Sequence, residues 1–446
     1  MGARQEGRFD PFSAQMLFNI PAAIYSLGAV INYQWLGIDI GPNIGIPIWL
    51  FEDALWMTVL GMVAFNSAYL VSPWFNIRHT INRILPSLNT TRVQEKVLAK
   101  WGLAVAFGGE VILMLVMYYL GLGKVLHSQY DTAVQIDKSS FSFFIHGSIL
   151  MSDIGLVLAV AYLFKSGRWK TPFGLLTGIL LLWHVGFWVF FGKRGALLGV
   201  FLGVLISRHL LRKRISLAFG TVLVLAMVFL FVVVELGRSS PTRMYSDQIE
   251  MIFFRAEFLE DWRMWVGKVL SQGGLLGSLT VITELFPDVY EYRLGATYLE
   301  AFIRIIPRFL WIDLFPQGYS SLVGQNWAIF YLAEAYMNFG WIGIVMIPCL
   351  IGIGLRLFNE WKRAYRNHYM IVVIFAVLAG QIVYLPRLDS GSLSKGFVYP
   401  LLVLFALYIA TLKFSRKKRV RDVKQIDKVY RYMHADGSTR GIKAYD

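Results

Sequence analysis

About ten apolar runs follow one another along the 446 residues, and most of them are close to 20 residues long. A helix needs about 20 apolar residues to cross the ~30 Å hydrocarbon core of a bilayer. Strands that alternate apolar and polar residues, which an outer-membrane barrel requires, are not found in the sequence. With 56% hydrophobic and 16% charged residues, the composition also differs from that of soluble domains. The sequence therefore predicts an all-α polytopic membrane protein.

The predicted spans divide one membrane domain, residues 1–446, into about ten transmembrane helices. They cover residues 16–36, 48–71, 101–122, 141–164, 173–191, 196–206, 215–234, 330–355, 371–385 and 397–412. The sixth run is short unless it continues to Leu211, with Arg208 reaching the membrane surface. We expect the first run to be an uncleaved signal anchor, because it is longer than the apolar part of a signal peptide and has no clear cleavage site.

Lysine and arginine are concentrated in alternate connections between the predicted spans. Cationic connections stay in the cytoplasm. If the amino terminus lies inside, the inner connections and the basic cytoplasmic tail, residues 413–446, hold most of the 43 Lys and Arg. This pattern predicts a multi-pass protein with both termini in the cytoplasm. The net charge of +15 then follows from membrane insertion and gives no reason to expect nucleic-acid binding.

One connection, residues 236–328 between the seventh and eighth spans, is much longer than the others and is expected outside the cytoplasm. Loops of this length without a function are uncommon. Residues 244–270 have the spacing of an amphipathic helix, and a Gly-rich stretch follows at 271–277. Arg304 and Arg308 are four residues apart, on one face of a further helix. We therefore expect a large helical extracytoplasmic loop that can cover a cavity between the spans.

Two arginines are expected at the outer membrane boundary, away from most other positive charges. Arg194 lies in the turn 191–195, and Arg387 lies in the segment 385–389. A guanidinium group at this depth costs a few kcal/mol unless an anion meets it, so such a residue is a candidate functional residue. An anionic, lipid-linked substrate would be a suitable partner. The alternatives are contacts with lipid phosphates or an ion pair with Asp389.

The sequence gives no reason to expect a metal or another cofactor. The long loop contains no histidine, and the outer carboxylates are scattered. Gly-rich phosphate loops that join a strand to a helix are absent from the sequence, so a nucleotide substrate is not expected. The single cysteine, Cys349, excludes an intramolecular disulfide.

His184 and Glu110 lie inside apolar runs, where we expect them to have polar partners within the bundle.

Four short motifs give the chain a resemblance to the Wzy family of bacterial polymerases, which join lipid-linked oligosaccharide repeat units in O-antigen, enterobacterial common antigen and capsule synthesis. The motifs are GKRG at 192–195, IIPRFLW at 305–311, AEAYMNFGWIG at 333–343 and RLDS at 387–390. All four are expected on the outer side, and the resemblance covers most of residues 192–394.

The resemblance implies a glycosyltransferase with a GT-C-like fold in the bacterial inner (plasma) membrane. Such a transferase moves a growing glycan from one undecaprenyl pyrophosphate carrier to a sugar hydroxyl on another carrier-bound repeat, without metal or nucleotide. The implied partners are the glycan donor and acceptor, membrane lipid and a polysaccharide chain-length regulator.

The residues of the motifs suit this reaction. Negative charge builds up on the departing pyrophosphate, and forked guanidinium donors match that charge. We expect Arg194 and Arg387 to bind the pyrophosphate. Further substrate contacts are expected from Arg308, Arg304, Lys193 and Tyr336.

The attacking hydroxyl needs a proton acceptor within hydrogen-bond reach. Glu334 is the first candidate for this base, followed by Asp389 and Glu300. The alternative for Glu334 is a structural role, in which it caps a helix or neutralises a neighbouring arginine.

Three other functions fit a chain of this class. An O-antigen ligase characteristically has a histidine in its large outer loop, and this loop has none. A lipid-linked oligosaccharide flippase or other transporter would show internal repeats, broken helices and charges deep in the bundle. A lipid phosphatase would be expected to have a histidine or acidic cluster in its outer loops.

Overall fold

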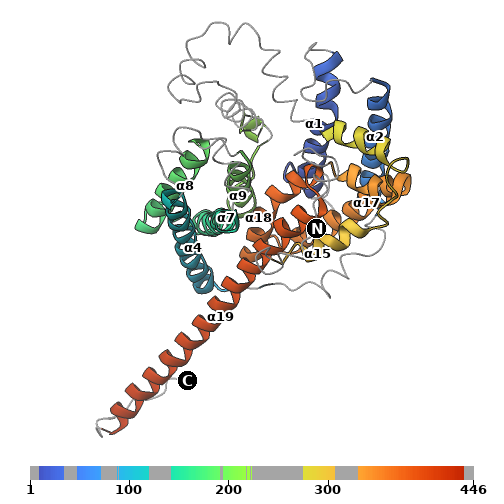
Figure 1. Cartoon of the computed structure of the whole chain (residues 1–446). Helices are drawn as coiled ribbons and strands as arrows, with labels where there is room; N and C mark the ends of the chain where they lie inside the picture. Colours follow the sequence, from blue (N-terminus) through green and yellow to red (C-terminus); the bar gives the residue numbers. More distant parts are fainter. Residues whose placement is uncertain are drawn as a thin grey trace, which may run out of the picture.

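A computed structural model describes residues 10–34, 48–71, 88, 90–119, 142–190, 194–216, 218–220, 222–223, 275–306 and 330–435. Within these ranges every regular element is a helix (Figure 1). Seven of the described helices are long and apolar enough to cross a membrane. They are α2 (Ile48–Val71), α4 (Arg92–Tyr119), α7 (Ser142–Ser166), α8 (Pro172–Phe190), α17 (Tyr331–Ala364), α18 (Tyr369–Tyr384) and α19 (Ser390–Ala435). The predicted class, a helical polytopic membrane protein, is thus confirmed.

The other described elements are α1 (Ala14–Gln34), α9 (Arg194–Leu211), α14 (Leu275–Leu285), α15 (Ala296–Ile303) and the 3-10 helix η7 (Leu385–Arg387). Every predicted span except the seventh falls on a described helix. The seventh, residues 215–234, lies mostly outside the described residues. Helix α9, on which the sixth predicted span falls, does reach Leu211, yet it remains a shorter apolar helix. The total of ten spans therefore stays a prediction.

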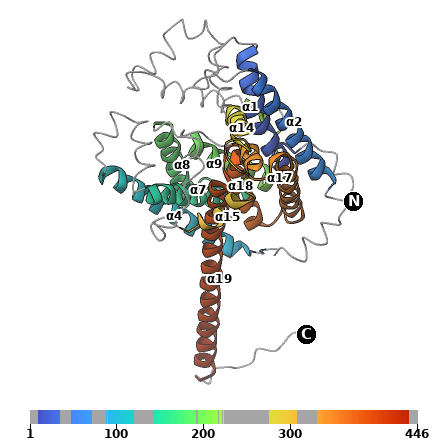
Figure 2. The same ribbon diagram turned by 45° about the vertical axis from the view of Figure 1, so that its right-hand side comes forward.

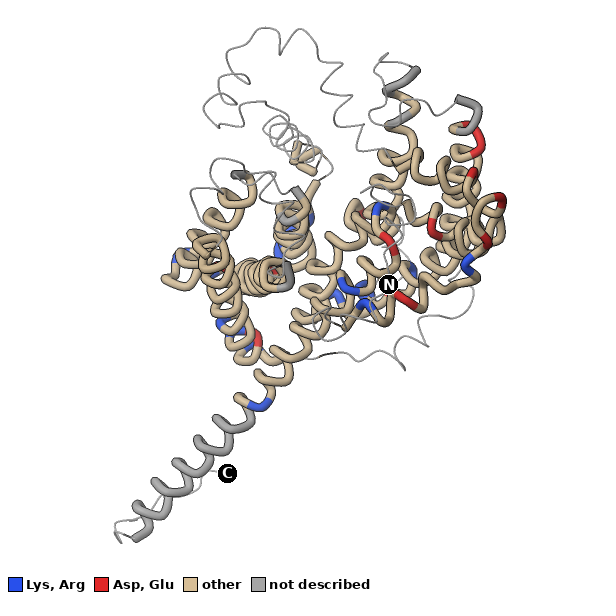
Figure 3. Tube along the Cα trace, in the orientation of Figure 1, with Lys and Arg blue, Asp and Glu red and all other residues tan. Residues whose placement is uncertain are grey.

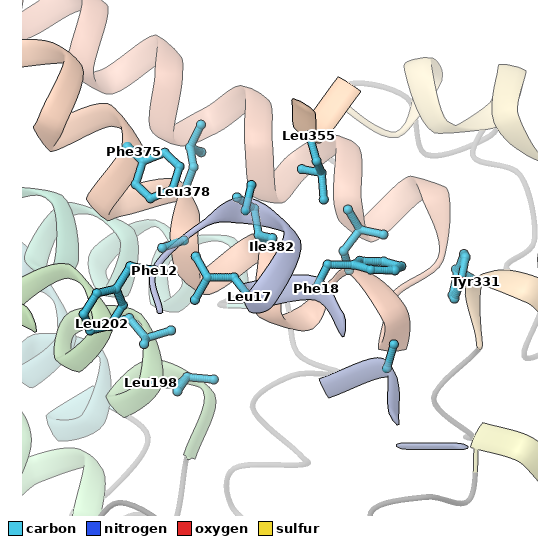
Figure 4. Close-up of a cluster of buried hydrophobic side chains, with 14 of the residues drawn as sticks. Phe12, Leu17, Phe18, Leu198, Leu202, Tyr331, Leu355, Phe375, Leu378 and Ile382 are labelled. Carbon is cyan, nitrogen blue, oxygen red and sulfur yellow. The ribbon is translucent and has the colours of Figure 1, made fainter. Parts of the chain in front are cut away.

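Helix α18 lies at the centre of the main core. Its residues are apolar on every side, and most are buried, which is the pattern of a helix surrounded by other helices. It packs against α9, α1, α7 and α19. Figure 4 shows Phe375, Leu378 and Ile382 of α18 in one cluster with Leu198 of α9 and Phe18 of α1.

The helices approach one another closely where small residues meet. Helices α4 and α7 form the most extensive contact in the described chain. A Cβ atom at Gly102 of α4 would lie only 2.7 Å from the Cβ of Leu158 in α7. Glycine at such positions lets two helix backbones come together, which is how helices associate in a membrane without a hydrophobic driving force.

Helix α17 is broken at Gly340, whose φ of 57° and ψ of −141° are not helical. A Cβ atom at Gly61 of α2 would lie 2.8 Å from the Leu332 side chain and 3.4 Å from the carbonyl oxygen of Ile344. In a straight helix, Leu332 and Ile344 would be about 18 Å apart. The part of α17 before Gly340 therefore folds back beside the part that follows it.

The break in α17 leaves backbone carbonyl groups without hydrogen-bond partners in the helix. The segment before α15 donates hydrogen bonds to two of them. The backbone N–H of Arg293 donates to the carbonyl of Met337 at 3.0 Å, and that of Leu294 donates to Asn338 at 3.0 Å. Unpaired backbone groups are costly at membrane depth, so a broken helix persists only where the protein satisfies them. The chain around residue 294 thus stabilises the end of the short buried part of α17.

Part of the long predicted loop belongs to the core. Leu275, Leu276, Leu279 and Ile282 of α14 are fully buried, and α14 packs against α2 and α17. The Gly-rich stretch at 271–277 ends inside this helix, because residues 275–277 form its first turn. The amphipathic helix predicted at 244–270 lies outside the described residues.

The last helix, α19, continues past the bundle. It begins at Ser390, contains Pro400 and runs as one element to Ala435. Figures 1 and 2 both show its second half projecting away from the other helices. Most of the basic segment predicted as a tail, residues 413–446, is therefore a continuation of the last span.

Candidate functional site

Polar residues from distant parts of the sequence meet where α15, the start of α17 and the start of α19 come together. Both views of the fold place α15 beside α19 (Figures 1 and 2). We call this group the polar cluster and define it by seven residues: Thr297, Glu300, Arg304, Glu334, Asn338, Asp389 and Ser390. It includes all three predicted carboxylates and one of the predicted arginines.

Glu334 is the most deeply buried carboxylate of the cluster, with 5% of its surface exposed. Both of its oxygens are already bonded to Ser390. The backbone N–H of Ser390 donates to Oε2 at 2.7 Å, and the Ser390 hydroxyl donates to Oε1 at 2.5 Å. The first N–H groups of a helix have no helical partner and favour an anion. Glu334 therefore joins the start of α17 to the start of α19.

Asp389 bridges α19 and Arg304. Its Oδ1 accepts the backbone N–H of Ser392 at 3.0 Å, as an N-cap aspartate does. Its Oδ2 accepts a hydrogen bond from Nη1 of Arg304 at 2.8 Å. Gly391 allows this contact, because a Cβ atom there would lie 2.5 Å from Cδ of Arg304.

Arg304 lies between two carboxylates. Besides Asp389, its Nη2 atom lies 3.7 Å from Oε2 of Glu300, one helical turn earlier. Within the described part of the chain, the buried Nε of Arg304 has no hydrogen-bond partner. Glu300 is the most exposed carboxylate of the cluster, with a side chain 27% exposed against 16% for Asp389.

Asn338, which the sequence analysis did not single out, holds the cluster together. Its side-chain N–H groups donate to the hydroxyl of Thr297 at 2.7 Å and to the carbonyl of Glu334 at 2.8 Å. Its side-chain oxygen accepts the N–H of Gly295 at 3.0 Å. The sequence feature that could have identified Asn338 is an amide side chain inside an apolar run, because a buried amide needs hydrogen-bond partners. Ser390 gave no comparable signal.

Tyr336 is in contact with other aromatic residues. Its ring centroid lies 6.1 Å from that of Tyr292 and 6.4 Å from that of Trp341, and only 6% of the residue is exposed. Trp341 is 52% exposed and so offers more surface for stacking on a sugar. The role of Tyr336 in substrate binding stays a prediction.

The positions of Arg194 and Arg387 lie at the same end of one helix pair. Helices α9 and α18 pack closely, and a Cβ atom at Gly195 would lie 3.3 Å from the hydroxyl of Tyr384. Arg194 precedes Gly195 at the start of α9, and η7 carries Arg387 directly after α18. Arg387 is partly exposed, and the Arg194 side chain is outside the described atoms.

Because Asp389 follows Arg387 by two residues, the two arginine positions and the polar cluster share one end of the molecule. Arg308 and Lys193 lie outside the described residues. Their predicted roles in substrate binding stay predictions.

A second polar group lies inside the bundle. Nδ1 of His184 in α8 lies 2.6 Å from Oε1 of Glu110 in α4, and its Nε2 lies 3.1 Å from Oδ1 of Asp153 in α7. Trp183 also donates to Glu110 at 3.2 Å. This confirms that Glu110 and His184 are partners in the bundle. No group of three metal-ligating side chains is suitably arranged in the described chain, and the expectation of a metal-free site stays a prediction.

These observations define a helical polytopic membrane protein with a polar cluster at one end of its bundle and a histidine between two carboxylates inside it. Comparisons of the chain with protein-family models, with curated proteins and with solved structures gave no match.

Proposed function

We propose that the protein is a membrane glycosyltransferase that joins oligosaccharide repeat units carried on undecaprenyl pyrophosphate, as a Wzy-like polymerase. The observation that carries the proposal is the polar cluster, in which Arg304, Glu300, Asp389 and Glu334 come together from α15, α17 and the start of α19. It lies at the same end of the molecule as the predicted arginines. A cationic group beside carboxylates is the combination that a metal-independent glycosyl transfer requires.

In the proposed reaction, the bond from the sugar's anomeric carbon to the pyrophosphate breaks, and a bond forms from that carbon to the acceptor hydroxyl. Arg387 and Arg194 bind the pyrophosphate oxygens as they gain charge. Arg304 assists them by holding Glu300 and Asp389 beside the site through its Nη atoms. The leaving group departs on its lipid carrier, so no cofactor is required.

The acceptor proton moves to a carboxylate, and we propose Glu300 for this role. Glu300 is the most exposed of the three candidates, and within the described ranges its carboxylate has only the 3.7 Å contact with Arg304. Asp389 is the second candidate. Glu334, the first candidate from sequence, already accepts two hydrogen bonds from Ser390, so we propose that it positions α19.

The proposal places the protein in a bacterial plasma membrane, with the polar cluster on the extracytoplasmic face. Its partners are then the lipid-linked donor and acceptor, and a chain-length regulator for the polysaccharide.

The test is a reconstituted reaction. Purified protein in nanodiscs receives lipid-linked repeat units and EDTA, with no nucleotide, and the products are separated by glycan length. We expect longer glycans. No extension of an authentic substrate, or a strict requirement for a divalent cation, would rule out this function.

A lipid-linked oligosaccharide flippase is the second candidate, and two observations favour it. Helix α17 is broken at Gly340, and Glu110, Asp153 and His184 lie inside the bundle, as in many transporters. Proteoliposomes with a fluorescent lipid-linked oligosaccharide separate the two functions. Movement of the lipid between leaflets without any glycan extension would favour the flippase.

A further inference from the structure

A large cavity with basic walls opens between α4, the end of α7 and α19. Its volume is about 1040 Å³. Its lining residues are Arg92, Val93, Glu95, Lys96, Val97, Lys100, Trp101, Ala104, Tyr162, Lys165, Ser166, Arg168 and Phe414. Figure 3 shows Lys and Arg on α4 near the place where α19 leaves the bundle. The lining therefore combines a strong positive charge with aromatic surface.

Among the residues that the structure describes, most of the positive charge in this basic cavity has no acidic partner. Lys165 forms an ion pair of 2.6 Å with Glu95, the one acidic residue of the lining. No ion pair within the described chain involves the other four cationic residues, Arg92, Lys96, Lys100 and Arg168. Converging charges of one sign in a recess concentrate ions of the opposite sign. The cavity is thus suited to an anion with more than one negative oxygen.

The basic cavity is separate from the polar cluster. Ser390 belongs to the cluster and Phe414 lines the cavity, and both lie on α19. Their separation along a helix is about 36 Å, close to the ~30 Å thickness of a hydrocarbon core. The two sites therefore lie at opposite membrane surfaces.

Exposed apolar residues continue from the cavity along α4 and α19, two of the helices that line it. On α4, Phe107 is 59% and Leu115 is 61% exposed, beyond the cavity residues Trp101 and Ala104. On α19, Leu402, Phe405 and Ile409 are exposed on the membrane side of Phe414. Charge at the end of a span followed by an apolar surface toward the bilayer centre matches a molecule with an anionic head and long apolar chains.

We propose that the basic cavity binds the phosphate headgroup of an anionic phospholipid, whose acyl chains lie along α4 and α19. Basic pockets between membrane helices commonly bind such headgroups. A free phosphate or pyrophosphate would contact the same cations but would leave the apolar surfaces of α4 and α19 unused. The lipid therefore stabilises the contact between α19 and the rest of the bundle.

The test compares thermal unfolding of the full chain in nanodiscs of three kinds. The first contains phosphatidylcholine alone, the second contains added phosphatidylglycerol, and the third contains phosphatidylcholine with inorganic pyrophosphate in solution. A ligand that binds the folded state raises the unfolding temperature. We expect phosphatidylglycerol to raise it by several degrees and pyrophosphate to leave it unchanged.

Two double variants test whether the cavity is responsible. Lys96→Glu with Lys100→Glu should lose most of the phosphatidylglycerol shift. The control, Arg212→Glu with Lys213→Glu, makes the same charge change on exposed residues at the end of α9. This control should keep the phosphatidylglycerol shift. If the first variant does not fold, Lys96→Gln with Lys100→Gln replaces it, with the same expectation.

Three outcomes would overturn the proposal. They are an absent phosphatidylglycerol shift in the wild type, an equal shift in both double variants, and an equal stabilisation by pyrophosphate. The first would mean that no headgroup is bound, the second that the charge of the surface acts without the cavity, and the third that the ligand is a soluble anion.

Discussion

At the polar cluster, three carboxylates of similar chemistry have different surroundings. Glu334 is held by both bonds from Ser390, and Asp389 is held by Arg304 and the start of α19. Glu300 has the largest exposed fraction, and its one contact with a described side chain is the long one with Arg304. A proton acceptor must reach a substrate hydroxyl, so the least engaged carboxylate is the best placed. This difference leads to a test in which conservative variants of Glu300 and Glu334 are compared.

Glu300→Gln is expected to lower the rate of glycan extension by about 100-fold or more, which is the usual contribution of a general base. Glu334→Gln should have a smaller effect, because the amide oxygen can still accept the N–H of Ser390. Initial rates at saturating substrate, measured over a range of pH, distinguish the two. Equal activity of Glu300→Gln and wild type would remove Glu300 from this role, and a larger loss in Glu334→Gln would assign the role to Glu334.

At the scale of the helices, two features explain why the bundle has this arrangement. Gly340 breaks α17 and allows its first part, with Glu334, to fold back into the core. His184 joins α8 to α4 and α7 by contacts with Glu110 and Asp153. The first feature depends on a residue without a side chain, and the second depends on one imidazole. A single substitution therefore tests each of them.

Gly340→Ala is expected to destabilise the protein and to abolish extension of the glycan. A residue with a Cβ atom at this backbone conformation costs about 1–3 kcal/mol, and the atom would also lie 2.9 Å from the hydroxyl of Tyr292. The control is Gly354→Ala in the same helix, where a Cβ atom meets nothing within 4 Å. Thermal unfolding in detergent measures the stability of both variants. Equal unfolding temperatures would show that the break does not require glycine.

His184→Ala is expected to lower stability by about 3–5 kcal/mol, because it removes the contact of the partly exposed Asp153 and leaves the buried Glu110 with Trp183 as its partner among the described residues. Leu182→Ala, at a 75% exposed position of the same helix, should have a much smaller effect. Adding Glu110→Gln and Asp153→Asn to His184→Ala should restore much of the loss, since the buried charges are then removed. Chemical unfolding of the purified variants gives the comparison. An unchanged stability of His184→Ala would mean that the carboxylates are not held by the histidine.

At the scale of the whole molecule, α19 connects two sites of different character. Its first residue belongs to the polar cluster, and Phe414 lines the basic cavity about 36 Å away. The cationic connections predict that the cavity faces the cytoplasm and the cluster faces outward.

Cysteine labelling tests this orientation, because the chain has a single cysteine to remove. In a Cys349→Ser background, Ser392→Cys beside the cluster should react with a membrane-impermeant maleimide added outside the cell. Lys100→Cys at the cavity should react only after the membrane is opened. Both positions are exposed in the fold. The reverse labelling pattern would invert the predicted topology.

Part of the candidate site could be predicted from the sequence. Glu334, Asp389, Glu300 and Arg304 were candidates because of their residue types and motifs, and the fold brings these four together. The partners that fix them, Asn338 and Ser390, were missed because their bonds join segments far apart in the chain. The sequence also could not distinguish a carboxylate with two hydrogen bonds from one that is partly exposed.

The sequence by itself determined the helical class and the positions of most spans, because the thickness of a bilayer sets the length of an apolar run and the cost of unpaired backbone groups requires a helix. Only the tertiary structure decided that α14 enters the core, that α17 folds back at Gly340, and that α4, α7 and α19 together line a basic cavity. These features depend on contacts between residues distant in the chain. Such contacts produce no periodic pattern in the local sequence, so they cannot be predicted from it.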